Sequence, residues 1–185
     1  MPRQKVDKQH IIKQALNLFR QKSYFNTSMA DIATACGLLK GSLYHYFDSK
    51  ESLMREVVRS VHEYFIAKVF HFAYDHSVSP KTRMENFFKA ANHIFVDEES
   101  GDMLGNIGVE TAILIPEFAE DIRLFFSDFF QAIQTIYLDK YGPEIAMELA
   151  ERCVAEIEGS IMLSRLFNDK SYLQNTTNRI ILRLD

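Results

Sequence analysis

A helix-turn-helix pattern between Thr27 and Leu53 constrains this chain more than any other feature of its sequence. Two short helical segments flank Gly37, and glycine tolerates the left-handed backbone that a tight turn between helices needs. Apolar residues of both segments can form a small core, namely Ile32, Ala33, Leu38, Leu43 and Phe47. The second segment then turns outward a short, donor-rich and aromatic set, Lys40, Gly41, Ser42, Tyr44, His45 and Tyr46. Such a surface suits phosphates and base edges, so the pattern predicts a DNA-binding element.

The distribution of charge agrees with this prediction, although the formal net charge of the whole chain is -4. Residues 1–55 hold nine Lys and Arg against four Asp and Glu, whereas residues 56–185 hold twelve against twenty-one. Contacts with phosphates need positive charge at the DNA-binding end, and an acidic remainder helps to orient that end toward DNA.

Hydrophobic periodicity predicts an all-α protein, because helical spacing recurs along the chain and no strand alternation stands out. We expect a helix-turn-helix DNA-binding domain over residues 1–48 and a helical effector-binding and dimerisation domain over 49–185. The expected helices are 7–22, 27 or 28 to 36, 39–46, 49–74, 81–96, 103–115, 117–141, 144–167 and 171–184.

The motif Thr27-x4-Ile32-Ala33-x3-Gly37-x3-Gly41-x2-Tyr44-x2-Phe47-x2-Lys50 closely resembles the DNA-binding domain of the TetR family of one-component transcriptional regulators. The resemblance covers about the first 55 residues, and the remainder resembles the family only in length and helical pattern. It implies a homodimer that binds double-stranded operator DNA and responds to a small, largely apolar effector, with no cofactor.

Several positions are expected to contact DNA. Thr27 or Ser28 caps the second helix, and the free N–H groups there attract a phosphate. The resemblance assigns DNA contact to Lys40, Gly41 and Tyr44. Lysine can donate to guanine, and a glycine lets the backbone approach the groove. Phosphate contacts are expected from His45 and Tyr46, and from Lys50 in the first turn of the next helix. Ser42, another outward position, is also expected to contact DNA.

Three positions depart from the family pattern. Leu39 stands where a Ser or Thr commonly caps the recognition helix, so one phosphate contact is lost. Tyr46 stands where His is frequent. Ser23 replaces a frequent glycine at the end of the first helix, where a left-handed residue is expected, at a cost of about 1 kcal/mol.

The second half of the chain is rich in phenylalanine, and a large helical core explains most of these rings. The resemblance nevertheless implies an apolar cavity with a few polar groups that orient a ligand. Asn106 and Glu110 are the best polar candidates, with an exposed helix face as the alternative. The candidate ligand-binding residues are Phe65, Phe88, Met103, Asn106, Ile107, Glu110, Phe126 and Phe130.

A dimer interface is expected on the last two helices, since a helix-turn-helix reads a palindrome as a two-fold dimer. The candidates are Leu149, Cys153, Ile157, Ile161, Ile180 and Ile181. The alternative is that this apolar stripe packs only within its own subunit. Cys153 is expected to be a buried structural cysteine, with a redox sensor as the alternative, and Cys36 is expected to be inert.

Composition limits the other classes of function. No apolar run reaches the 18 residues of a transmembrane helix, the polar N-terminus lacks a signal core, and two cysteines make no disulfide framework. We therefore expect a cytoplasmic protein. The six histidines show no metal spacing, so no metal is expected. Two rival interpretations remain: a small helical enzyme, which no nucleophile–base pair supports, and an interaction protein whose helix-turn-helix no longer binds DNA.

Overall fold

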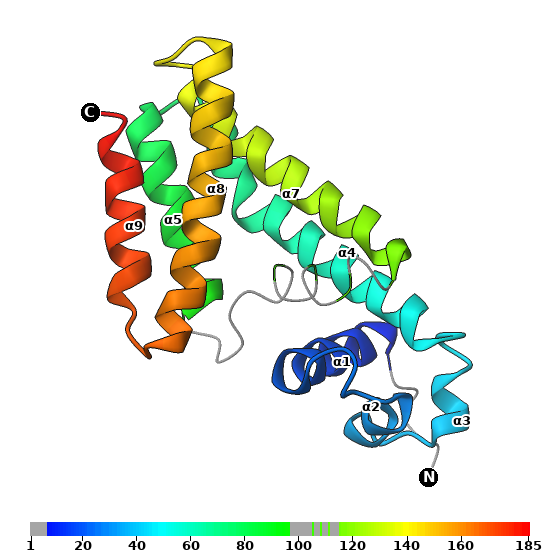
Figure 1. Cartoon of the computed structure of the whole chain (residues 1–185). Coiled ribbons are helices and arrows are strands. Elements are labelled where there is room, and N and C mark those ends of the chain that lie inside the picture. Colours follow the sequence, from blue (N-terminus) through cyan, green and yellow to red (C-terminus); the bar gives the residue numbers. More distant parts are fainter. Residues whose placement is uncertain (1–6, 97–104, 106–107, 109–110, 112–114) are drawn as a thin grey trace. The chain divides into compact units, whose positions relative to one another are not determined.

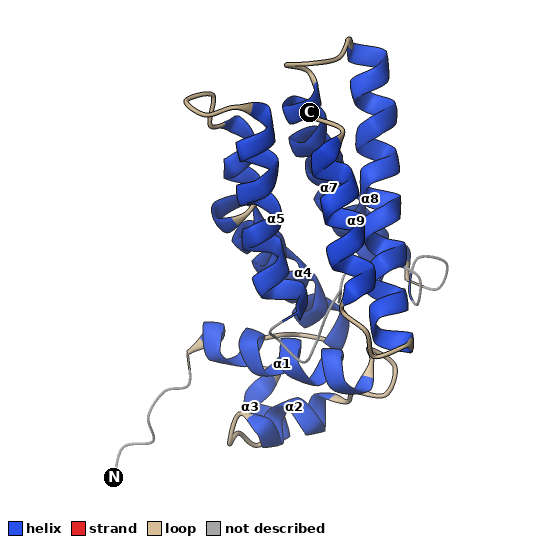
Figure 2. Ribbon diagram, turned by 90° about the vertical axis from the view of Figure 1, so that its left-hand side faces the viewer, coloured by secondary structure: helices blue, strands red, loops and turns tan. Residues whose placement is uncertain are grey.

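The computed structural model describes residues 7–96, 105, 108, 111 and 115–185 (Figure 1). These residues form α-helices and one 3-10 helix, and no strand is found among them (Figure 2). The predicted all-α class is therefore confirmed. The elements are α1 (Lys8–Lys22), α2 (Met29–Ala35), α3 (Lys40–Leu43), α4 (Lys50–Lys68), η1 (Phe70–Tyr74), α5 (Pro80–Val96), α7 (Pro116–Tyr137), α8 (Pro143–Leu166) and α9 (Ser171–Leu182).

The chain divides into two compact units, and the helices α4 and α7 each continue from one unit into the other. The first unit comprises Met1–His62 and Met103–Ile122, and the second comprises Glu63–Asp102 and Arg123–Asp185. This division differs from the boundary predicted after residue 48. The reason is that the first turns of α4 belong to the core of the first unit, where Leu53, Met54 and Val57 are fully buried.

The first unit is built around the predicted helix-turn-helix. α1 packs against α2, and α2 packs against α3. Of the predicted core, Ile32, Ala33, Leu43 and Phe47 are buried, while Leu38 is half-buried. On α1, Ile11 and Phe19 complete this core.

The second unit is a helical bundle with an aromatic core. α9 packs against α8 and α5, and these three helices lie side by side in Figure 1. The ring of Phe70 on η1 stacks on Phe87 of α5 and Phe129 of α7, with ring centroids 5.9 and 5.6 Å apart. Phe65 meets Phe125 edge to face at 5.1 Å. These five phenylalanines are all buried, so they supply much of the apolar area that stabilises the bundle.

Two helices end earlier than their sequence periodicity predicts. α3 ends at Leu43, because the N–H groups of His45 and Tyr46 donate to carbonyls three residues earlier and tighten the predicted final turn. The long helix predicted to reach Tyr74 is α4, which ends at Lys68 and is followed by the 3-10 helix η1. Phe70 and Ala73 of η1 are buried, so packing of this segment accounts for the change of helix type.

Candidate nucleic-acid interface

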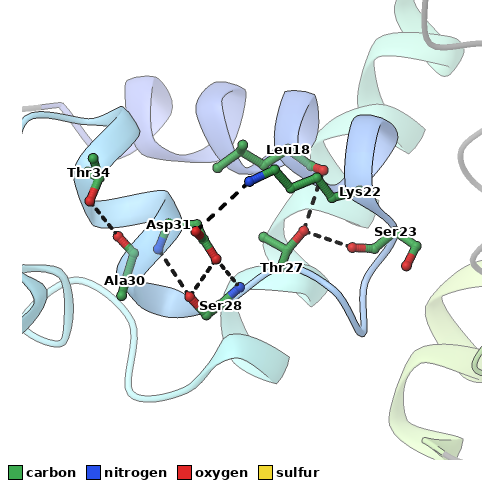
Figure 3. Close-up of polar contacts among 8 residues, drawn as sticks. All are labelled: Leu18, Lys22, Ser23, Thr27, Ser28, Ala30, Asp31 and Thr34. Carbon is green, nitrogen blue, oxygen red and sulfur yellow. Dashed lines mark hydrogen bonds and ion pairs between the residues drawn. The ribbon is translucent and has the colours of Figure 1, made fainter.

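The start of α2 is fixed by a capping box, drawn in Figure 3. The backbone N–H of Asp31 donates to the Ser28 hydroxyl at 3.2 Å, and the backbone N–H of Ser28 donates to the Asp31 carboxylate at 2.9 Å. The pKa of Asp31 is lowered, first by its hydrogen bond from the Ser28 hydroxyl. The cap is therefore Ser28, and a phosphate would have to compete with Asp31 for its hydroxyl.

Thr27 points into the protein and not toward solvent. Its hydroxyl donates to the carbonyl of Ser23 at 2.8 Å, and the side chain is 1% exposed (Figure 3). A hydroxyl that is buried and already bonded does not cap α2, and a phosphate contact through the free N–H groups at the start of this helix stays a prediction. The role of the Thr27 hydroxyl is to hold the turn between α1 and α2.

The turn between α2 and α3 has the geometry that the sequence predicts. Gly37 has a φ of 66°, which is the left-handed region that glycine enters without a Cβ clash. The N–H of Leu38 then donates to the carbonyl of Ala33 at 2.8 Å and closes the end of α2. Leu39 precedes α3 with an extended backbone and makes no side-chain cap, as expected for a leucine.

The outward residues of α3 and of the turn that follows it form the candidate DNA-binding face. Lys40, Tyr44 and His45 are exposed, whereas Ser42 and Tyr46 are half-buried. A Cβ added to Gly41 would meet nothing within 4 Å, so nothing within the chain requires a glycine there. Glycine costs a helix about 1 kcal/mol relative to alanine. A close approach by an external backbone or base would explain its presence.

Lys50 is held inside the first unit. Its ammonium donates to the carbonyls of Tyr24 and Thr27, at 3.0 Å each, and lies 4.1 Å from the centroid of the Tyr24 ring. Two of its three donors are therefore committed to the turn between α1 and α2. The predicted phosphate contact of Lys50 stays a prediction, with at most one donor left for it.

Tyr24 is the centre of this arrangement, although no sequence motif predicts a role for it. Its ring is 1% exposed and meets Phe118 of α7 edge to face, with centroids 5.1 Å apart. Its hydroxyl donates to Glu51 at 2.8 Å. We call Tyr24, Lys50, Glu51 and Phe118 the Tyr24 cluster. The sequence feature that could have indicated it is its place next to Ser23, which departs from the family pattern. Ser23 has a φ of 66°, which confirms the expected left-handed backbone.

An ion-pair group fastens the first turns of α7 to α4 within the same unit. Asp121 accepts from Arg55 at 2.8 Å and lies 3.5 Å from Arg59. The Asp121 side chain is only 12% exposed, so this pair of contacts is better shielded from water than a surface salt bridge. Together with the packing of Phe118 on Tyr24, it ties the start of α7 to the helix-turn-helix unit.

The candidate effector residues fall into two groups. Met103, Asn106, Ile107 and Glu110 lie outside the described residues. Phe65 and Phe88 are buried in the aromatic core of the second unit, where they pack on other phenylalanines, and Phe126 and Phe130 are half-buried. The half-buried pair keeps surface free for a ligand, whereas the buried pair has a structural role in this core.

The candidate dimer residues need a correction. Cys153, Ile157, Ile161 and Ile180 are at most 4% exposed in a single chain, so they pack within their own subunit and offer no surface to a partner. This is the alternative that the sequence left open. Leu149 and Ile181 are half-buried and remain candidates.

The two cysteines are buried thiols. Burial raises the pKa of Cys153 well above its ordinary value, and burial raises the pKa of Cys36 as well. A thiol that resists ionisation is a poor nucleophile, so neither residue has the character of a redox sensor. Among the described residues, no group of His, Cys, Asp or Glu is arranged to hold a metal ion. None of the described helices has the length and apolar character to cross a membrane.

Comparison with known proteins places the helix-turn-helix in a family. Residues 11–57 match the family described as "Bacterial regulatory proteins, tetR family". The HTH-type transcriptional repressor DhaR of Mycobacterium sp. (strain GP1) is 23% identical over 172 residues, which cover 90% of this chain and 86% of that protein. The uncharacterized HTH-type transcriptional regulator YxaF of Bacillus subtilis (strain 168) is 29% identical over 174 residues, or 90% and 88% of the two chains.

Solved structures share the fold over the whole chain. The crystal structure of a TetR transcriptional regulator from Legionella pneumophila matches with a TM-score of 0.89 and 23% identity, covering 100% of each chain. A regulatory protein TetR from Rhodobacter sphaeroides matches with a TM-score of 0.86 and 21% identity, covering 98% of this chain and 100% of that one. At such identities the likeness concerns the fold alone.

Removing the Tyr24 hydroxyl should give a pH-dependent loss of stability. The pKa of Glu51 is lowered from 4.5, first by a hydrogen bond from its own backbone N–H and further by the Tyr24 hydroxyl. Its stabilising contribution is therefore complete above pH 4.5 and is lost as the pH falls through the lower folded-state pKa. We expect Tyr24→Phe to cost about 1 kcal/mol near neutral pH, after allowance for solvent screening at Glu51, and less at about pH 3.5.

Urea unfolding of both proteins at these two pH values measures this cost. The cost should fall in alkali as well, because burial raises the pKa of Tyr24 above its ordinary 10.0, so above that pH the wild type loses a contribution of Tyr24 that the variant never had. If Tyr24→Phe lowered the free energy of unfolding equally at neutral and acid pH, the stabilising hydrogen bond from Tyr24 to the ionised Glu51 would be contradicted.

Proposed function

The chain belongs to the TetR family of transcriptional regulators, and from this premise we propose that it is a repressor released from a palindromic operator by a small molecule. The observation that carries this proposal is the exposed face of α3. Lys40 of α3 is exposed, as are Tyr44 and His45 directly after it, while Leu43 and Phe47 of the same segment are buried. A helix whose inner side is fully used for packing, and whose outer side carries donors and an aromatic ring, is suited to the major groove.

The operator is expected to be a palindrome whose half-sites are about one helical turn apart, because a two-fold dimer presents two copies of α3. Selection of random duplexes by the purified full-length protein at moderate salt tests this directly. Enrichment of a palindrome supports the proposal. Weak, salt-sensitive binding without enrichment of any sequence would contradict it and would favour an interaction protein whose helix-turn-helix no longer binds DNA.

Removing the outward groups of α3 should weaken binding to the selected operator. We expect Lys40→Ala to reduce affinity roughly 5- to 150-fold if it donates to a guanine, since one good base contact is worth about 1–3 kcal/mol. If Lys40 contacts a phosphate instead, the slope of log affinity against log salt concentration should become shallower by about one, with little change in sequence preference. Tyr44→Phe separates the role of the hydroxyl from that of the ring.

Lys68→Ala serves as the control for this measurement. It removes an equal charge from an exposed lysine at the C-terminal end of α4, outside the helix-turn-helix. Fluorescence anisotropy with labelled duplex provides the affinities. If Lys40→Ala and Tyr44→Phe both bound the operator with wild-type affinity, the proposal that this face contacts DNA would be contradicted.

A stripe along α8 is the surface that best fits a dimer contact. Helical spacing aligns Ile145, Arg152, Ala155, Gly159, Met162 and Leu166 on one face, and none of them is buried. Met162 and Leu166 are 61% and 72% exposed, which is unusual for large apolar side chains. A Cβ added to Gly159 would meet nothing within 4 Å, so the middle of this stripe can accept a closely packed helix from a second subunit.

Filling the space at Gly159 should therefore weaken the dimer without unfolding the subunit. We expect Gly159→Leu to raise the dimer dissociation constant roughly 5- to 100-fold through overpacking, while the helix itself gains up to about 1 kcal/mol. Sedimentation equilibrium measures the association, and circular dichroism measures the helix content. Met147→Tyr, on another face of α8, is the control. Unchanged association in Gly159→Leu would exclude this stripe as the interface.

The proposed effector response uses the attachment of α7 to α4. The candidate effector residues Met103, Asn106, Ile107 and Glu110 directly precede α7 in the sequence. The start of α7 is held by Phe118 on Tyr24 and by Asp121 on Arg55 and Arg59. A ligand that binds one position of α7 better than another would move α4 and α3 together with it.

Breaking the ion-pair group should uncouple ligand binding from DNA release. A panel of apolar aromatic and acyl compounds is first screened for release of labelled operator. For any compound that releases it, Asp121→Asn should reduce the fold-change in operator affinity, which is about 5- to 150-fold in typical allosteric proteins, while the compound still binds. Glu120→Gln, an exposed neighbour on α7, is the control. Equal release in both variants would show that this attachment does not carry the response.

A further inference from the structure

Leu39 is an exposed apolar side chain at the start of α3. Its side chain is 67% exposed, whereas Leu43, one helical turn later, is fully buried. The backbone of Leu39 is extended, with φ -74° and ψ 147°, so Leu39 precedes the regular turn of α3. The leucine therefore contributes little to the core, and it makes no cap for the helix.

The place of Leu39 in the fold is where a recognition helix meets bases. The N-terminal residues of such a helix contact base edges in the major groove. Leu39 adjoins the exposed Lys40, whose ammonium is one of the donors of the candidate DNA-binding face. A leucine side chain has no donor or acceptor, so neither a phosphate nor a polar base edge is a suitable partner for it.

We propose that Leu39 is a specificity-determining residue that packs on the C5-methyl group of a thymine in each half-site. This methyl group is the apolar feature that the base pairs present in the major groove, and it distinguishes thymine from the other bases. Burial of Leu39 against it removes apolar surface of both groups from water, which is favourable. The inference rests on the proposed function, since it needs α3 to lie in the major groove.

Deoxyuridine scanning of the selected operator tests this proposal. Each thymine is replaced in turn by deoxyuridine, which removes one methyl group and keeps the base pairing. One buried methyl group is worth roughly fourfold in affinity. Wild-type protein should therefore lose roughly fourfold per half-site at one symmetric pair of thymines, and Leu39→Ala should bind the thymine and deoxyuridine duplexes equally well.

Leu124→Ala is the matched control, because Leu124 is also exposed, at 56%, but lies on α7 outside the recognition helix. This control should keep the wild-type preference for thymine. The assignment is overturned if no thymine shows the preference, or if Leu39→Ala retains it at the same position. Failure of the wild type to select any duplex would instead overturn the proposed function, and the role of Leu39 with it.

Discussion

The arrangement of the DNA-binding unit depends on the two hydrogen bonds from Lys50 to the carbonyls of Tyr24 and Thr27. These carbonyls belong to the turn between α1 and α2, where Ser23 holds a left-handed backbone. The Tyr24 ring of the same turn contacts both the Lys50 ammonium and the Phe118 ring. One lysine of α4 thus fixes the turn that leads into α2, and α2 in turn packs against α3. The orientation of α3 therefore depends on hydrogen bonds and packing within the protein, made by residues outside the candidate DNA-binding face.

The Lys50 ammonium, although close to the candidate DNA-binding surface, is committed mainly to hydrogen bonds within the protein. The Tyr24 carbonyl also accepts from the backbone N–H of Thr27 at 3.3 Å, so Lys50 adds a second, charged donor there and donates to the Thr27 carbonyl as well. The Tyr24 cluster also includes the start of α7, through Phe118, and Asp121 adds ion pairs to Arg55 and Arg59. The helix-turn-helix unit therefore contains a short piece of a helix whose remainder forms the aromatic core of the second unit.

Local patterns in the sequence predicted the parts of the fold that depend on local physics. The turn at Gly37, the cap at Ser28 and the left-handed Ser23 follow from backbone sterics and capping, and all three are present. Long-range packing was harder to predict. The sequence leaves either Thr27 or Ser28 as the cap of α2, and only the burial of Thr27 decides that its hydroxyl faces inward. Likewise, Cys153 and Ile157 on the apolar stripe of α8 are buried within the single chain. Helical periodicity identifies an apolar face but not the element that covers it.

The proposed function requires that the candidate DNA-binding face of α3 and the turn after it contacts DNA. Hydrogen–deuterium exchange of the full chain, with and without a saturating specific duplex, tests it most directly because exchange is measured along the whole backbone. DNA is expected to slow exchange in residues 38–47, which contain α3 and its flanking turns. Slowed exchange elsewhere in the chain, with no change in residues 38–47, would contradict it.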